Sequence, residues 1–158
     1  MRKASAKEIY AASLIFLIGI VYLVAQADAL FSMGSTTVRG DIIQLSKNEM
    51  LSHLRSILTI VLCFSGGILL LKIKKSGWII CQSVLLLLLT IAAGIFISNI
   101  TSLNSSGFIL IAGILLLLLA FIFLIQKATR QKFMVTKKNY QSVIVLFALL
   151  AVFYFLLQ

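Results

Sequence analysis

The chain has 158 residues, of which 61% are hydrophobic and only 11% charged, and its formal net charge at pH 7 is +10. So small a polar fraction cannot cover the surface of a soluble globular domain. A basic chain can be a nucleic-acid-binding protein, but here the basic residues occur at the ends of long apolar runs, with no basic stretch interleaved with aromatic residues. The composition therefore predicts an integral membrane protein and argues against nucleic acid as a partner.

Five apolar runs follow one another along the chain. A helix needs about 20 apolar residues to cross about 30 Å of hydrocarbon. The expected fold class is all-α: a polytopic transmembrane helix bundle with five spans, built as a single integral-membrane domain over residues 1–158. The predicted helices cover about 9–30, 51–71, 77–97, 107–125 and 140–157. The last run is short, but we expect it to span because residues 143–157 contain no charge.

The first run has a second interpretation. A basic start at residues 1–7, an apolar stretch and the small-residue pattern Ala25-Gln26-Ala27 resemble a cleavable signal peptide. The apolar stretch of 17 residues from Ile9 to Ala25 is longer than the roughly 7–15 residues of a signal peptide. We therefore expect an uncleaved helix. Cleavage would leave four spans, with both ends of the chain external.

Most of the basic residues form three clusters that lie before the first run, between the second and third, and between the fourth and fifth. Their members are Arg2, Lys3 and Lys7; Lys72, Lys74 and Lys75; and Lys127, Arg130, Lys132, Lys137 and Lys138. The positive-inside rule assigns these clusters to the cytoplasm. The N-terminus and the basic segment 126–139 are then cytoplasmic, whereas the loop 31–50 and the C-terminus are external. We expect a bacterial plasma (inner) membrane, because eukaryotic targeting signals are absent from the sequence, and contact between the clusters and anionic lipid headgroups.

Four polar residues are predicted at the external end of the first two helices. Gln26 and Asp28 lie near the end of the first helix, and His53 and Arg55 lie at similar depth near the start of the second. The favoured interpretation is an Asp28–Arg55 ion pair that joins the two helices, because an acid at the membrane edge is usually paired. The alternative is a small polar site for a headgroup or a solute in the outer leaflet.

Small residues inside the runs indicate helix packing. Gly66 and Gly67 lie together in the second helix, and Thr90, Gly94 and Ser98 recur every four residues in the third. Small residues at this spacing allow another helix to approach closely. The stripe on the third helix suits packing within the bundle and a homo-oligomer interface equally well.

Polar side chains and thiols also occur within the spans. Thr59, Gln82 and Ser83 are expected to form hydrogen bonds between helices. Cys63 and Cys81 are expected to differ in depth by about 8 Å, which is beyond the reach of a disulfide. We therefore expect two buried free thiols that pack as small apolar groups.

Reactive groups are sparse. The chain has one histidine and four acidic residues, and it lacks the HExxH, GxSxG, CxxC and glycine-rich phosphate-loop motifs. A metal set drawn from His53, Asp28 and either Asp41 or Glu49 has no recognised ligand spacing. No catalytic residue, cofactor or metal is therefore predicted.

The favoured function is a non-catalytic accessory or scaffold component of the bacterial plasma membrane, with a membrane-protein partner or a second copy of the chain. The alternatives are a lipid or small-solute carrier, a channel subunit and, less favoured, a membrane-embedded enzyme that modifies lipid. Ion or proton coupling usually leaves charged groups within the spans, and the central parts of these runs have none.

Overall fold

The computed structural model describes residues 4–36, 47–98 and 105–156, and these residues form helices and short turns without a strand. The helices are α1 (Ala6–Thr36), α2 (Lys47–Leu71), α3 (Lys75–Ser98), α4 (Ser105–Ile125), α5 (Lys127–Lys132) and α6 (Lys137–Leu156). All except the six-residue α5 are long and apolar enough to cross a membrane. The predicted all-α bundle with five spans is confirmed.

The helices extend beyond several of the apolar runs from which they were predicted. The first run suggested a helix over 9–30, but α1 begins at Ala6 and ends at Thr36. Its first turn is capped by Glu8, whose Oε2 accepts a hydrogen bond from the Ser5 backbone N–H at 2.7 Å. An acidic group here also interacts favourably with the helix dipole. Much of the predicted loop 31–50 is therefore helical, and its residues 37–46 lie outside the described residues.

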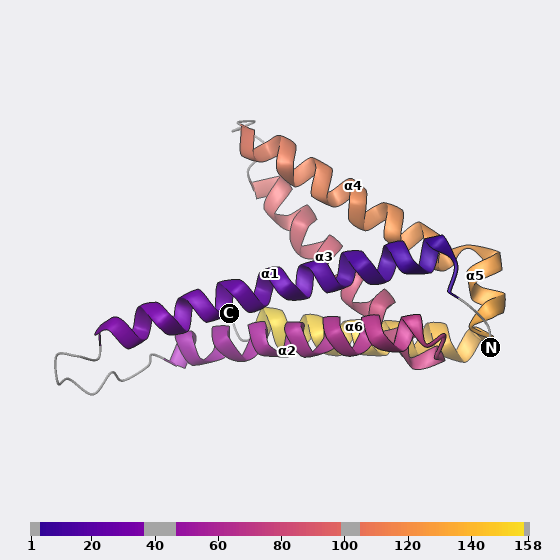
Figure 1. The fold of residues 1–158 in the computed structure, drawn as a ribbon, viewed down its shortest axis with the longest axis horizontal. Helices are drawn as coiled ribbons and strands as arrows, with labels where there is room; N and C mark the ends of the chain where they lie inside the picture. The colour runs from indigo at the N-terminus through magenta and orange to yellow at the C-terminus, as the bar shows by residue number, and fades with distance from the viewer. Residues whose placement is uncertain (1–3, 37–46, 99–104, 157–158) are drawn as a thin grey trace.

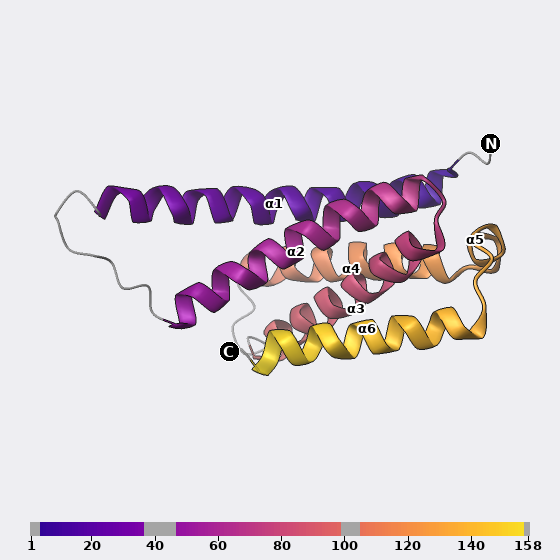
Figure 2. The same ribbon diagram turned by 90° about the horizontal axis from the view of Figure 1, so that it is seen from below.

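The central helix of the bundle is α3. It packs against α2, α4 and α6, whereas α1 packs against α2 and α4. In Figures 1 and 2, α1 and α6 run away from the end that carries α5, α2 runs back toward that end, and α3 leads toward α4. Figure 1 also shows that the distal parts of α3 and α4 lean away from the other three long helices. The bundle is thus closed at one end and splayed at the other.

The closed end carries the basic clusters, and it is called the basic end below. Figure 1 shows the N-terminus, the turn between α2 and α3, and α5 together at this end. Direct contacts join them, because Lys7 Nζ donates to Gln126 Oε1 at 2.5 Å and Lys132 Nζ to Glu8 Oε2 at 2.6 Å. The opposite end, called the far end, holds the end of α1, the start of α2 and the end of α6. The described members of the three clusters therefore lie on one side of the bundle.

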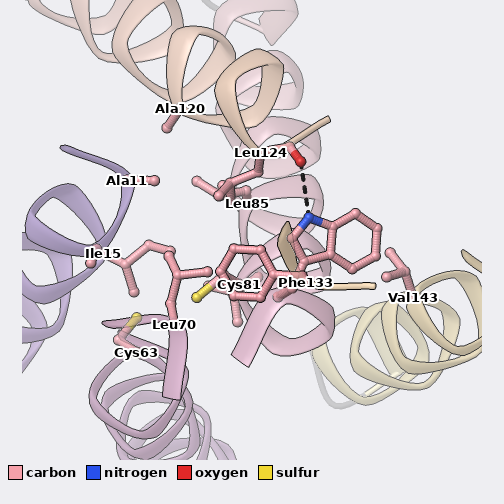
Figure 3. Packing of buried hydrophobic residues seen from close by; sticks show 13 residues of the cluster. Ala11, Ile15, Cys63, Leu70, Cys81, Leu85, Ala120, Leu124, Phe133 and Val143 are labelled. Atoms are coloured by element: carbon pink, nitrogen blue, oxygen red, sulfur yellow. Dashed lines mark hydrogen bonds between the residues drawn. The ribbon is translucent and has the colours of Figure 1, made fainter. Parts of the chain in front are cut away.

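The buried core lies near the basic end and draws side chains from every long helix (Figure 3). Its members include Ala11, Ala12 and Ile15 of α1, Cys63 and Leu70 of α2, Trp78, Cys81, Val84 and Leu85 of α3, Ala120 and Leu124 of α4, Phe133, and Val143 of α6. The Trp78 indole Nε1 donates to the Leu124 carbonyl at 2.9 Å, as the dashed line in Figure 3 marks. This bond satisfies one of the last carbonyl groups of α4, which have no partner within the helix.

Two turns at the basic end share one backbone motif. Ile73 and Met134 have positive φ angles of 54° and 50°, and each lies just after a helix. The N–H groups of Ile73 and Met134 bond to Leu70 O at 2.9 Å and to Gln131 O at 3.2 Å. In each turn the next N–H bonds to the carbonyl five residues before it, at 3.0 and 2.9 Å. This is the Schellman pattern, in which glycine usually occupies the left-handed position.

Candidate functional site

The polar residues predicted at the far end occupy two different places in the structure. Gln26 on α1 and His53 on α2 face each other, and the Gln26 amide Nε2 lies 2.5 Å from His53 Nδ1. The contact links α1 to α2 where the two helices approach the far end.

The expected Asp28–Arg55 ion pair is not formed in the structure. Asp28 is exposed, and the ion pair found among the described residues joins Lys132 to Glu8 instead. The physical reason is helical phase: at 3.6 residues per turn, positions i and i+2 are about 200° apart around the axis. Because Gln26 and His53 face each other, Asp28 and Arg55 are turned away from that contact. The structure thus brings Gln26 and His53 together, but it does not pair Asp28 with Arg55.

Arg55 contacts the end of α6. Its Nη1 donates to the Tyr154 carbonyl at 3.4 Å, and its guanidinium carbon lies 5.4 Å from the centroid of the Tyr154 ring. Tyr154 is in the last turn of α6, where carbonyl groups lack partners within the helix and a cation is favourable. Arg55 therefore joins the start of α2 to the end of α6, and α6 runs the length of the bundle.

A narrow pocket lies beside this contact, between α1, α2, α3 and α6. Its polar lining consists of Tyr22, Arg55, Thr59 and Tyr154. The remaining lining is apolar and consists of Leu58, Leu62, Val84, Leu87, Leu88, Ile91, Leu150 and Phe153. The enclosed space is about 20 Å³, which is the room of about one water molecule. Polar groups are thus concentrated on a few positions of a largely apolar pocket that contains one cation.

A wider groove lies between α1, α3 and α4, where α3 and α4 diverge from the bundle. It has a volume of about 260 Å³ and is open to the side. Its lining is apolar throughout and consists of Leu14, Ile18, Leu88, Ile91, Ala92, Ile95, Leu110, Gly113, Leu116 and Leu117. A Cβ atom added at Gly113 would meet no described atom within 4 Å. The wall of the groove is therefore open at this glycine.

The glycines predicted for helix packing lie in close contacts. A Cβ atom at Gly66 would be 2.9 Å from Ile80 Cγ2 on α3, and one at Gly67 would be 2.8 Å from the Phe16 ring on α1. Larger residues would push these helices apart. Gly66 and Gly67 therefore lie in tight contacts of α2 with α3 and α1.

The stripe of Thr90, Gly94 and Ser98 is exposed, and a Cβ atom added at Gly94 would meet no described atom within 4 Å. Ser83 lies on the same side of α3, one heptad before Thr90, and its hydroxyl donates to Val143 O of α6 at 3.1 Å. The side of α3 that faces α6 near Ser83 is thus uncovered farther along, because α3 leans away from α6 (Figure 1). An interface with another chain at this stripe stays a prediction.

The other polar residues within the spans behave in three ways. Ser83 forms the expected bond between helices, whereas the Thr59 hydroxyl donates to Arg55 O of its own helix at 2.9 Å. Gln82 is only 2% exposed, and neither polar atom of its side chain has a hydrogen-bond partner. Cys63 and Cys81 are buried free thiols, as the estimate of their depths predicted.

Sequence reasoning missed a polar network at the basic end. The Glu8 side chain is 1% exposed and contacts Lys132, Lys7 contacts Gln126, and Arg130 Nη1 donates to the Tyr140 hydroxyl at 3.2 Å. One signal for this network was present, since Glu8 is the one acidic residue in the segments predicted to be cytoplasmic. Because Glu8 is one acid among many basic residues, the sequence does not say which of them it pairs with.

In the part of the chain that the structure describes, no three histidine, cysteine or acidic side chains lie together in a way that could hold a metal ion. The hollows in the described part of the chain include the narrow pocket at Arg55, the apolar groove between α1, α3 and α4, and an open, shallow hollow on α6 that is lined by Lys138, Gln141, Ser142, Val145, Leu146 and Leu149. Comparison of the chain with models of protein families, with curated protein sequences and with solved structures gives no match.

Proposed function

We propose that this chain is a small non-catalytic multi-pass protein of a bacterial plasma membrane and acts as an accessory or scaffold component that binds a transmembrane helix of another membrane protein. The observation that carries the proposal is the apolar groove between α1, α3 and α4, with a volume of about 260 Å³. The groove lies along membrane-spanning helices, so that its partner is a helix within the bilayer.

The composition of the groove suits a helix. Association of helices in lipid depends on close van der Waals packing, and small residues at the interface allow backbones to approach. Gly113 and Ala92 provide such positions in the walls contributed by α4 and α3. The lining contains no charged residue, which favours an apolar partner segment. The groove is open to the side, and Figure 1 shows that the distal parts of α3 and α4 lean away from the other long helices.

We also infer the orientation. The basic end is assigned to the cytoplasm by the positive-inside rule, which places the N-terminus inside and the C-terminus outside. Exposed basic residues there, such as Lys72, Lys74 and Lys127, would contact anionic headgroups, each contributing about 1 kcal/mol near the membrane surface. A cysteine placed at Lys75 should react with an impermeant thiol reagent only after the cells are opened, whereas one at Ser52 should react in intact cells.

The helix-binding proposal is tested by site-specific photo-crosslinking in native membranes. A photoreactive phenylalanine analogue at Leu116, which lines the groove and is exposed, should give one discrete crosslinked product. The same analogue at Val61, on the exposed side of α2, is the matched control and should not give that product. The Gly113→Leu variant should abolish the Leu116 product, because its side chain would fill the groove. Equal products at both sites, or a product indifferent to Gly113→Leu, would refute the proposal.

A product with twice the mass of the chain would identify the partner as a second copy. A second candidate function, a carrier or binder of lipid or a small solute, is favoured by a separate observation, the pocket at Arg55.

A further inference from the structure

We propose that the narrow pocket at Arg55 binds one lipid-like amphiphile, with the phosphate or carboxylate of its headgroup on Arg55 and its apolar chain along α2 and α3. This site uses different residues from the helix-binding groove, apart from Leu88 and Ile91 of α3, which border both. The two proposals therefore succeed or fail separately.

The first argument is the charge of Arg55. The residue lies within the second span, 16 positions before Leu71, or about 24 Å along the helix axis. Its contacts are the Tyr154 carbonyl at 3.4 Å and the Tyr154 ring, and both are neutral. Among the described residues no carboxylate forms an ion pair with Arg55. A part-buried cation without a counter-charge favours an anionic ligand.

The second argument is the unused hydrogen-bonding capacity of Arg55. A guanidinium group has five N–H donors in a fixed plane, and the structure uses one of them, in a long bond to Tyr154. The planar fork suits the two oxygens of a carboxylate or a phosphate better than an ammonium group does. The other polar groups near this level are engaged elsewhere, since Gln26 and His53 bond to each other and Asp28 is exposed.

The third argument is the distribution of polarity in the pocket. Tyr22, Thr59 and Tyr154 line the pocket together with Arg55, whereas Leu62, Val84 and the other lining residues are apolar. A site for a free inorganic anion would be polar on all sides, but here a continuous apolar wall adjoins the cation. The space of about 20 Å³ admits about one headgroup oxygen. The rest of the headgroup and the chain would lie at the opening, against α2 and α3.

The contact between Arg55 and the end of α6 is compatible with this site. It occupies one donor and the face of the Tyr154 ring, so that the remaining donors can bind a headgroup. A bound anion would also strengthen the link between α2 and α6, because it would neutralise the positive charge of Arg55, the α2 residue that contacts α6.

The experiment is a titration of the purified, delipidated protein in a neutral detergent, followed by native mass spectrometry. The probes are phosphatidylglycerol, oleate, phosphatidylcholine and inorganic phosphate. We expect one equivalent of phosphatidylglycerol or oleate to bind at least about tenfold more tightly than phosphatidylcholine. Arg55→Gln should lower this affinity about tenfold, and Arg55→Lys should lower it less, because the charge remains.

The matched control is Lys75→Gln, which removes an exposed positive charge at the basic end and should change the affinity by less than about twofold. If Lys75→Gln weakens binding as much as Arg55→Gln does, general electrostatic attraction explains the result and the site is refuted. Equal affinity for phosphatidylglycerol and phosphatidylcholine also refutes it. If millimolar inorganic phosphate displaces the amphiphile, the ligand is a solute and the proposed chain contact is wrong.

A second variant keeps the test decisive if Arg55→Gln fails to fold. Thr59→Leu enlarges a lining residue whose hydroxyl bonds to its own helix, so that the Arg55–Tyr154 contact is left in place. The larger side chain should narrow the pocket and lower the affinity for phosphatidylglycerol at least about fivefold, with the helix content by circular dichroism unchanged. Unchanged binding in this variant would overturn the placement of the ligand.

Discussion

The Glu8 carboxylate oxygen Oε2 lies 2.6 Å from Lys132 Nζ, although 124 positions separate the two residues in the chain. Glu8 is in the first turn of α1, and Lys132 is the last residue of α5. The Glu8 side chain is 1% exposed and that of Lys132 is 21% exposed. The pair therefore joins the first helix to the connector between the last two spans and closes the basic end of the bundle.

Replacement of Glu8 by glutamine should lower the free energy of unfolding by about 1–3 kcal/mol. Loss of one partner leaves the other charge without its ion pair, and the loss is moderated because Lys132 is partly exposed. The glutamine side-chain oxygen can still accept the hydrogen bond from the Ser5 N–H. The substitution therefore removes the ion pair and keeps the helix cap. Unfolding by sodium dodecyl sulfate in mixed micelles, followed by circular dichroism, measures the change.

The double variant Glu8→Gln with Lys132→Met should recover part of the stability lost in Glu8→Gln, because the charge left behind is removed as well. Strictly additive losses in the two single variants would show that the residues do not interact.

Glycine at Met134 should stabilise the protein by about 0.5–1 kcal/mol. Met134 has a φ of 50° and its side chain is 57% exposed, so that glycine relieves a left-handed backbone and removes little packing. Glycine at Ile73, with a φ of 54°, should instead lower stability, because the Ile73 side chain packs against the core. Thermal unfolding of both variants tests the difference. A gain at Ile73 together with a loss at Met134 would contradict this account.

Alanine at Gly77 should destabilise the protein by about 1–3 kcal/mol or more. Its Cβ would lie 2.4 Å from Leu69 C and Leu70 N, which are backbone atoms, so the turn between α2 and α3 would have to open. Alanine at Gly94 is the matched control, because its Cβ would meet no described atom within 4 Å. Gly94→Ala should leave stability unchanged or raise it slightly through its higher helix propensity. Parallel unfolding curves compare the two variants, and equal losses would be inconsistent with the packing described.

The first helix should remain in the mature protein. Ala11, Ala12 and Ile15 of α1 belong to the buried core, and Glu8 closes the basic end. Removal of α1 would expose this core surface and would leave Lys132 without its ion pair. The intact mass of protein purified from membranes is the measurement. A mass that lacks residues 1–27 would support the signal-peptide interpretation instead.

The contacts at the far end were predicted from the sequence only in part. The apolar runs placed Gln26, Asp28, His53 and Arg55 at one level, and the structure brings Gln26 and His53 together there. The ion pair expected for Arg55 is replaced by Tyr154, which is 99 positions away in the chain. Counting residues along a helix gives the position of a residue along the span. Its partner depends on which neighbouring helix lies against the side of the helix that carries the residue.

The same distinction holds for the small residues. Gly66, Gly67, Thr90 and Gly94 carry the same packing signal in the sequence, but Gly66 and Gly67 are buried in helix contacts whereas Thr90 and Gly94 are exposed. The cause is the divergence of α3 from α6, which depends on contacts along the full length of both helices.

The sequence by itself determined the membrane-spanning class, the number of long helices and the separation of the basic clusters from the other end of the bundle. These properties follow from position along the chain, because hydropathy and charge act on each segment as it meets the bilayer. Only the tertiary structure decided that Glu8 binds Lys132, that Arg55 contacts α6, and that α3 and α4 leave a groove open. These relations depend on the rotation and crossing of packed helices, which are set by side-chain contacts between distant segments.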